Sequence, residues 1–478
     1  MKKEEIKNIR LFLSVLTFTA AATSAAAPIA TPVEVQPDLT RGQVQRSQEP
    51  EKSPLPQSEK PAPSMTAEEA LQHPALLANA LDTALAQQNT DGIRFLLPIY
   101  RRLPAEQQNP VLAKYAETVL MQADGNLKQA EKQYREMLAE NPEFAPIRLQ
   151  LAHTLSQNGK QREAAREIAV IRQTPELPPQ VDGYLNNFDK YLKDARSWKF
   201  DGSLSYLQES NVARAPEQRT YGNWEFEEPK SAHGLAYEVS AQKTVPLKNH
   251  WAARVQASVG GKFYWDAHDY DDLIARAETG AVWRDAKQEA SFAPFYEKRW
   301  YGTEPYSDQV GGTLRYSRIL SPKFQLHGAW QSGYKKHDDR KYLDGAAHSL
   351  SGTLVHLTTP KQILFYGIDG GIDNARDLSE AYRRYGVRAG WQQNWGNSGN
   401  TETALHLLAQ RRHYRASDLF GIQRRDTEYA ARASLSHKKL SWKGLTPRLN
   451  WAWSHIDSNH FYYRYDQHRV FVDIVKRF

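Results

Sequence analysis

The sequence predicts a multidomain protein: an N-terminal all-α domain of tetratricopeptide-like repeats, followed by an antiparallel transmembrane β-barrel of about 14 strands. Apolar residues recur at helical spacing from residue 66 to 196, and from 197 to 478 they alternate with a period of two. Short turns and longer polar loops alternate between the expected strands, as they do in outer-membrane barrels. The first residues have the order typical of an export signal.

Residues 1–26 are predicted to be a cleaved signal peptide. Basic side chains at Lys2, Lys3, Lys7 and Arg10 precede an apolar run, Leu11–Ala22, and then a cluster of small residues. We expect cleavage near Ala26, or earlier after Ala22; the alternative is a cytosolic N-terminal helix. Residues 27–65 are rich in Pro, Gln, Glu, Lys and Ser. Such a segment buries too little apolar surface to offset its ordering entropy, so we predict a disordered linker.

The composition excludes several kinds of site. The chain has no cysteine, so it forms no disulfide and no thiolate-based catalytic or zinc site. No apolar run after residue 27 approaches the roughly 20 residues of a membrane-spanning helix, and the mean hydropathy is −0.69. Membrane crossing therefore requires a closed barrel, because open strands leave backbone groups unpaired in lipid. The net charge of +7 forms no basic stripe, so no nucleic-acid partner is expected.

Residues 66–196 are predicted to form a periplasmic helical-repeat domain. A period of 34 residues, that of tetratricopeptide repeats, relates two sets of residues: Gly125, Ala130 and Tyr134, and Gly159, Ala164 and Ile168. The glycines fall at turns between helices and the alanines where helices would cross, and Pro142 falls where a helix should end. Leu96 and Tyr100 indicate a degenerate first repeat. We expect three repeats and a closing helix near 180–196; an ordinary helical bundle is the alternative.

Residues 197–478 are predicted to form the outer-membrane barrel. In Trp251–Trp265, Val255, Val259 and other apolar residues alternate with polar ones, and Glu380–Trp395 repeats the pattern with Arg384 and Arg388 on the polar face. Apolar residues should face lipid and polar residues the lumen. Ten tryptophans near strand ends suit interfacial girdles, although some could pack inside: Trp198, Trp251, Trp265, Trp283, Trp300, Trp330, Trp391, Trp395, Trp451 and Trp453. A soluble β-sandwich is the alternative.

The connections between the expected strands fall into two classes. Short periplasmic turns are predicted at Pro246–Asn249, Asp285–Lys287, Ser321–Lys323, Thr358–Lys361 and Gly396–Gly399. Longer outside loops are predicted at Asn211–His233, Asp266–Asp272, Gly302–Asp308, His337–Gly345, Asn374–Ser379 and Arg415–Arg425. The last strand ends in Phe478, and a terminal aromatic on a closing strand is typical of the signal that the bacterial barrel-assembly machinery reads. Lys476 shares the parity of the apolar residues there, so the match is imperfect.

No catalytic, cofactor or metal residue is predicted. The chain lacks the H-E-x-x-H, G-x-S-x-G, Walker and Rossmann motifs, and its 15 histidines form no short ligand cluster. Two charged outside loops are weaker candidates for binding. Asp266, Asp269, Asp271 and Asp272 could hold a divalent cation, although acidic loops are usually only solvated. Five arginines could pair with lipopolysaccharide phosphates or an acidic partner: Arg411, Arg412, Arg415, Arg424 and Arg425. The alternative is that they only form a solvated rim.

The chain resembles the surface lipoprotein assembly modulator (Slam) family of Gram-negative bacteria from about residue 70 to the end. The matching helical segments are Leu97-Pro98-Ile99-Tyr100, Gln122-Ala123-Asp124-Gly125 and Tyr134-Arg135-Glu136. In the barrel they are Ala213–Pro216, Tyr221–Trp224, Arg299–Gly302, Arg412–Tyr414, Arg424–Asp426 and Gly444–Leu449. The resemblance implies a fourteen-stranded barrel with periplasmic tetratricopeptide repeats. It also implies transfer of lipoproteins to the cell surface, including receptors that take iron or haem from host proteins.

The sequence is compatible with three functions. The first is a non-catalytic outer-membrane translocator whose partners are a surface lipoprotein, the barrel-assembly machinery, outer-membrane lipid and a periplasmic chaperone. The second is an exporter of a polysaccharide, which usually has many more repeats and a lumen with aromatic and acidic platforms. The third is a barrel enzyme, which the missing motifs disfavour. The mixed Arg, Lys, Gln, Glu and Ser inner face favours the translocator.

Overall fold

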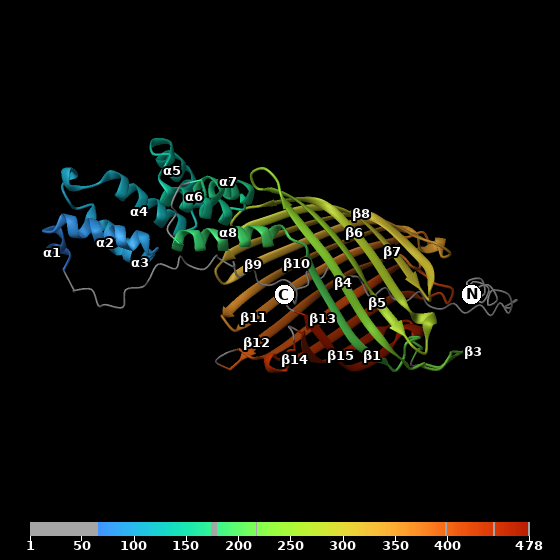
Figure 1. Cartoon of the computed structure of the whole chain (residues 1–478). Helices are drawn as coiled ribbons and strands as arrows, with labels where there is room; N and C mark the ends of the chain where they lie inside the picture. Colours follow the sequence, from blue (N-terminus) through green and yellow to red (C-terminus); the bar gives the residue numbers. More distant parts are fainter. Residues whose placement is uncertain (1–65, 174–178, 217, 397–398, 443–444, 477–478) are drawn as a thin grey trace, which may run out of the picture.

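The computed structural model describes residues 66–173, 179–216, 218–396, 399–442 and 445–476. The predicted signal peptide and linker, and Phe478, lie outside these residues. An array of helices leads into a closed barrel, and the helices lie beyond one end of the barrel (Figure 1). No helix in the described ranges is both long and apolar enough to span a membrane.

The helical region consists of a short leading helix, three antiparallel pairs and a closing helix, as predicted. The helices are α1 (Ala67–Leu71), α2 (Pro74–Ala86), α3 (Thr90–Tyr100), α4 (Pro110–Ala123), α5 (Leu127–Glu140), α6 (Ala145–Gln157), α7 (Gln161–Ile171) and α8 (Pro179–Arg196). Local sequence sets several boundaries. Asn109 caps α4 by accepting hydrogen bonds from the N–H groups of Val111 and Leu112, and Pro110 follows at the first helical position.

The repeat period is confirmed by the packing. Ala130 and Tyr134 of α5 are fully buried, and so are Ala164 and Ile168 of α7. These side chains belong to one apolar core that continues through α8. The α4–α5 and α6–α7 turns pass through the left-handed region at Gly125 and Gly159, each with φ +78°. In the α2–α3 turn that conformation falls on Gln88, with φ +51°, which explains why the first repeat looks degenerate.

The barrel closes with fourteen antiparallel strands, as predicted. They are β1 (Lys199–Glu209), β4 (Ala232–Pro246), β5 (Trp251–Tyr264), β6 (Asp272–Arg284), β7 (Gln288–Tyr301), β8 (Glu304–Ser321), β9 (Phe324–His337), β10 (Gly345–Thr359), β11 (Gln362–Ala375), β12 (Tyr382–Trp395), β13 (Thr401–Ser417), β14 (Gln423–His437), β15 (Leu445–Ser458) and β16 (Tyr465–Lys476). A small hairpin, β2 (Thr220–Tyr221) with β3 (Trp224–Glu225), lies in the β1–β4 connection.

The predicted inward and outward faces are also observed. Val255 and Val259 are exposed on the outside of β5, as Tyr385 and Val387 are on β12. Arg384 and Arg388 take the opposite parity and are partly buried. Of the ten tryptophans expected in the girdles, four are partly covered by neighbours. The other six are exposed: Trp198, Trp251, Trp265, Trp330, Trp395 and Trp451.

Two predicted outside loops are wrong in extent. Gly302–Asp308 is no long loop, because β8 begins at Glu304 and only two residues connect it to β7. Gly302 and Thr303 have φ +59° and +70°, and a pair of left-handed residues forms the tight turn that suits a twisted hairpin. Arg415–Arg425 is shorter than predicted because the strands continue to Ser417 and restart at Gln423. The charged residues at the ends of these strands explain why the sequence pattern predicts longer loops there.

Candidate functional site

The wall of the lumen is organised by buried arginines. Arg276 of β6 donates to Glu278 Oε1 at 2.7 Å and to Glu297 Oε2 of β7 at 3.2 Å. Its Nη2 group donates to Thr313 Oγ1 of β8 at 3.1 Å and to Gln331 Oε1 of β9 at 3.0 Å, and its guanidinium lies 3.7 Å from the centre of the Phe295 ring. One side chain therefore links four strands of the wall, β6 to β9, through charge-assisted hydrogen bonds.

Other parts of the wall repeat this arrangement. Arg388 of β12 forms an ion pair with Asp369 of β11. Arg448 of β15 donates to Asp473 of β16 at 2.6 Å, and Arg432 of β14 approaches the same carboxylate at 3.4 Å. Paired charges keep a wall wetted, because burying them away from partners or water is costly. A wall of this kind therefore suits water and polar groups and does not suit acyl chains.

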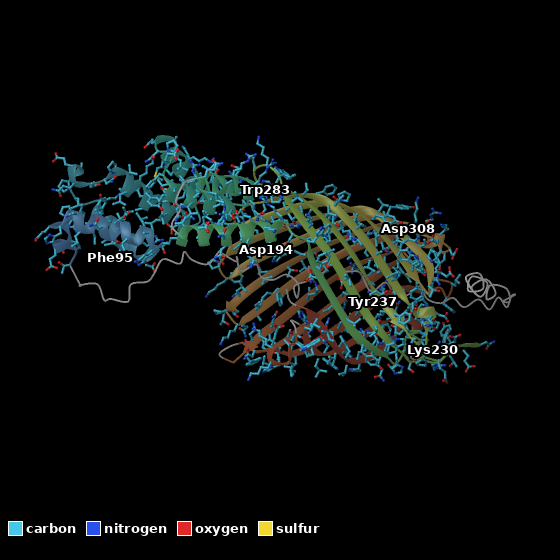
Figure 2. The ribbon with its side chains drawn as sticks, in the orientation of Figure 1. Phe95, Asp194, Lys230, Tyr237, Trp283 and Asp308 are labelled. Atoms are coloured by element: carbon cyan, nitrogen blue, oxygen red, sulfur yellow. The ribbon has the colours of Figure 1, made fainter. Side chains whose placement is uncertain are left out.

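The helical domain touches the barrel at the β6–β7 turn. A Cβ atom added to Gly159 would lie 2.4 Å from the backbone oxygen of Arg284, which also lies 3.1 Å from His250 Nδ1. Gly125, one repeat earlier, lies beside the Lys287 side chain. A Cβ atom added to Gly125 would lie 3.7 Å from the end of that side chain. Figure 2 shows Trp283 beside the helices, at the barrel end opposite Lys230. The repeat glycines therefore dock the helical domain at one mouth of the barrel.

The opposite mouth carries an aromatic cluster, which we call the loop clasp: Tyr221, Phe226, Phe420, Phe461 and Tyr462. These residues come from three connections, β1–β4, β13–β14 and β15–β16. The rings of Tyr221 and Phe461 stack with their centres 3.9 Å apart, and Phe420 meets Phe461 edge-on at 5.2 Å. The clasp ties the loop after the first strand to the loop before the last one.

The clasp is not predicted from the sequence, because no loop is expected at residues 459–464. The signal present there is the run Phe461-Tyr462-Tyr463 between two alternating segments. Three adjacent aromatics break the period of two and so indicate a connection. The partner aromatics Tyr221 and Phe420 lie in predicted loops, yet nothing local relates them to Phe461.

Asp266, Asp271 and Asp272 of the acidic loop have partners within the protein. Asp266 accepts a hydrogen bond from the backbone N–H of His233 at 3.0 Å, and this bond holds the pKa of the carboxyl below its ordinary value. Asp271 accepts from the backbone N–H of Tyr264 at 2.7 Å, and Asp272 pairs with Arg299 at 2.7 Å. Across the described residues, no three His, Asp or Glu side chains are placed to share a metal ion.

The predicted arginine set is divided by strand parity. Arg412 and Arg424 point into the barrel and are buried, where they pair with Glu428 at 2.9 Å and Asp426 at 2.6 Å. These two arginines are therefore not available to lipopolysaccharide, which corrects the prediction for them. The other three lie on the exposed side, where binding to phosphate stays a prediction: Arg411, Arg415 and Arg425.

Family models match both parts of this chain. The description "Surface lipoprotein assembly modifier" applies to residues 198–478, and "Surface lipoprotein assembly modifier, N-terminal TPR repeats" applies to residues 63–168. The first match alone covers more than half of the chain. The chain belongs to the surface lipoprotein assembly modifier family. The barrel accordingly places it in the outer membrane, and membership confirms the resemblance seen in the sequence.

Curated relatives extend over most of the chain. Surface lipoprotein assembly modifier 1 of Haemophilus influenzae is 34% identical over 87% of this chain and 87% of its own length. Surface lipoprotein assembly modifier 1 of Neisseria meningitidis serogroup B is 35% identical, over 85% and 84%. A hemophilin secretion modulator of Acinetobacter baumannii is 25% identical, over 85% and 86%. These relatives do not favour the alternative of polysaccharide export.

Solved structures match only distantly. The DcaP channel of Acinetobacter baumannii aligns with 59% of this chain and 96% of its own, at 8% identity and a TM-score of 0.36. A bacterial polysaccharide outer-membrane secretin aligns with 58% and 98%, at 11% identity and a TM-score of 0.32. Likeness at this level carries no functional argument.

Proposed function

We propose that this protein delivers partner lipoproteins to the cell surface as a non-catalytic outer-membrane factor. The observation that carries the proposal is the direct docking of a helical-repeat domain on one mouth of a charge-lined barrel, at Gly159 and Arg284. Repeat arrays present extended binding surfaces, so the helices provide a periplasmic surface for cargo beside the barrel. Family membership supplies the cargo class, a surface lipoprotein.

Several finer features belong to the same proposal. Residues 1–26 direct export, 27–65 are the linker, 66–196 form the periplasmic domain and 197–478 the barrel. The barrel-assembly machinery inserts the protein, and a periplasmic chaperone presents cargo that acquires iron or haem; the hemophilin secretion modulator name of one relative supports a haem-related cargo. No residue performs catalysis, because transfer of a finished lipoprotein requires no covalent step.

Protease accessibility tests the function. The protein is expressed together with the lipoprotein encoded beside its gene, in a Gram-negative host that lacks both. We expect external protease to cleave the lipoprotein in these cells and to leave it intact in cells that express the lipoprotein alone. Equal protection in both strains, with the barrel inserted, would contradict the proposal for that cargo. Release of a polysaccharide by the same cells would favour the exporter instead.

A further inference from the structure

The barrel is closed by a seam that is weaker than its other strand pairs. β1 pairs with β4 along its whole length, from Lys199 to Glu209. On its other side, among the residues that the structure describes, the ladder to β16 joins only Ser203, Leu204 and Ser205 to Val475, Ile474 and Asp473. β16 in turn pairs with β15 from Tyr465 to Lys476. Among the described residues, the longest interruption of a ladder therefore lies between the first and last strands.

The outer half of the seam is unzipped although both strands are present. Continuing the register would place Tyr206–Glu209 opposite Arg469–Val472, yet these described residues form no ladder. Unpaired strand edges expose N–H and C=O groups that lipid cannot satisfy. In the part of the chain that the structure describes, this seam therefore has fewer paired backbone residues than any other junction of the barrel.

Side chains close the seam instead. The buried carboxylate of Glu209, at the end of β1, accepts from Arg469 Nη1 of β16 at 2.7 Å. The same carboxylate accepts from Lys262 Nζ at 2.8 Å and from the Tyr264 hydroxyl at 2.9 Å, both on β5. Above it, the loop clasp stacks Tyr221 from the β1 side on Phe461 from the β16 side. Both contacts can separate without breaking a backbone ladder.

A lipid-anchored polypeptide makes two opposite demands on a barrel. Its polar chain needs a hydrated path, which the wall around Arg276 and Arg388 supplies. Its acyl chains need an apolar surrounding, and a wall of paired charges cannot provide one. A sideways opening in the wall satisfies both demands, because the chain then passes through the lumen while the acyl chains stay in the bilayer.

We propose that the β1–β16 seam is a lateral gate for the acylated segment of the cargo, and that Glu209 with the loop clasp holds it shut. This inference rests on the proposed function, which it deepens by naming the route of the lipid anchor. Among the described residues, opening separates the short ladder around Leu204 and Ile474, the Glu209–Arg469 pair and the clasp.

A disulfide across the seam tests the gate, because the chain has no cysteine of its own. The variant Leu204→Cys/Ile474→Cys joins directly paired residues that both face outward. The control, Val239→Cys/Val259→Cys, joins directly paired outward residues of β4 and β5. Each variant is expressed together with cargo, and the amount of cargo at the cell surface is measured before and after oxidation. Disulfide formation is followed by gel mobility. We expect oxidation to abolish new cargo display at the seam and to leave the control unchanged.

A second measurement needs no cargo. A single cysteine at Leu207, buried beside the unzipped stretch, is labelled with maleimide in inserted protein. Glu209→Gln should raise the labelling rate, whereas Glu278→Gln, a buried carboxylate elsewhere in the wall, should not. Unchanged display after seam oxidation, or equal labelling in both variants, would overturn the gate. Absence of display by the wild-type protein would overturn the proposed function, and the labelling would then still decide whether the seam opens.

Discussion

Replacing Gly159 by alanine should undock the helical domain from the barrel. An alanine at this position meets two difficulties. Its backbone would hold φ at +78°, which costs an L-residue about 1–2 kcal/mol. Its Cβ atom would also lie 2.4 Å from the carbonyl oxygen of Arg284, where no side chain can move aside.

Gly125→Ala is the matched control. Gly125 has the same φ of +78°, yet its added Cβ would meet only the end of the Lys287 side chain, at an ordinary 3.7 Å. Both variants carry the backbone strain, so the difference between them reports the clash. Overpacking of this kind costs about 1–3 kcal/mol. That penalty lowers the ratio of docked to undocked molecules by about 5- to 150-fold.

Distance measurements between two spin labels read the docking directly. With no native cysteine, labels at Lys128→Cys in α5 and Lys323→Cys in the β8–β9 turn are unique. We expect one narrow distance distribution for the parent and for Gly125→Ala, and a broad, longer one for Gly159→Ala. Cargo display should fall in parallel. A narrow, unshifted distribution for Gly159→Ala would refute the docking role of this glycine.

Three further predictions concern assembly, stability and pH. Deleting Phe478 should lower the amount of heat-modifiable protein in the outer membrane, and unchanged levels would contradict its role as an assembly signal. Arg276→Ala removes the arginine partner of Glu297, whereas Glu278 keeps its ion pair with Arg315, and should cost about 1.5–3 kcal/mol. The denaturant midpoint should fall relative to Arg383→Ala on the outer face, and an unchanged midpoint would show that the wall does not need this link. The His460 ring packs against Phe420 and Phe461 of the clasp. Burial, with Arg424 nearby, holds the pKa of His460 below its ordinary 6.5 although Asp418 and Asp426 oppose this. A closed clasp therefore binds fewer protons than an open one and loses stability as pH falls from about 7 to about 5. The rate at which protease cleaves residues 459–464 on intact cells should rise over this range, and a constant rate would contradict the prediction.

The sequence was sufficient for the architecture because each element has its own period. The 34-residue spacing of Gly125 and Gly159 identified the repeat, and the alternation around Val255 identified strands and their faces. The same alternation is sufficient to correct the prediction that all five arginines face the outside. Arg411 and Arg412 are adjacent in one strand, so they face opposite sides, and only one could lie on the rim.

The contacts that make the site were not predictable in the same way. Gly159 meets Arg284, and Tyr221 meets Phe461, across long stretches of chain that no local pattern relates. The seam is hidden for a related reason. The alternation of β1 and β16 resembles that of every other strand, and only their register shows that the ladder stops after Ser205.

Antibody labelling of the lipoprotein on intact cells tests the central claim most directly. Three strains are compared at equal lipoprotein levels: lipoprotein alone, lipoprotein with the full chain, and lipoprotein with a chain that lacks residues 66–196. A periplasmic protein serves as the control for leakage. If the barrel and the helical domain are both needed for delivery, the lipoprotein should be strongly labelled only in the strain with the full chain. Equal labelling in all three strains, with the periplasmic control unlabelled, would contradict the account.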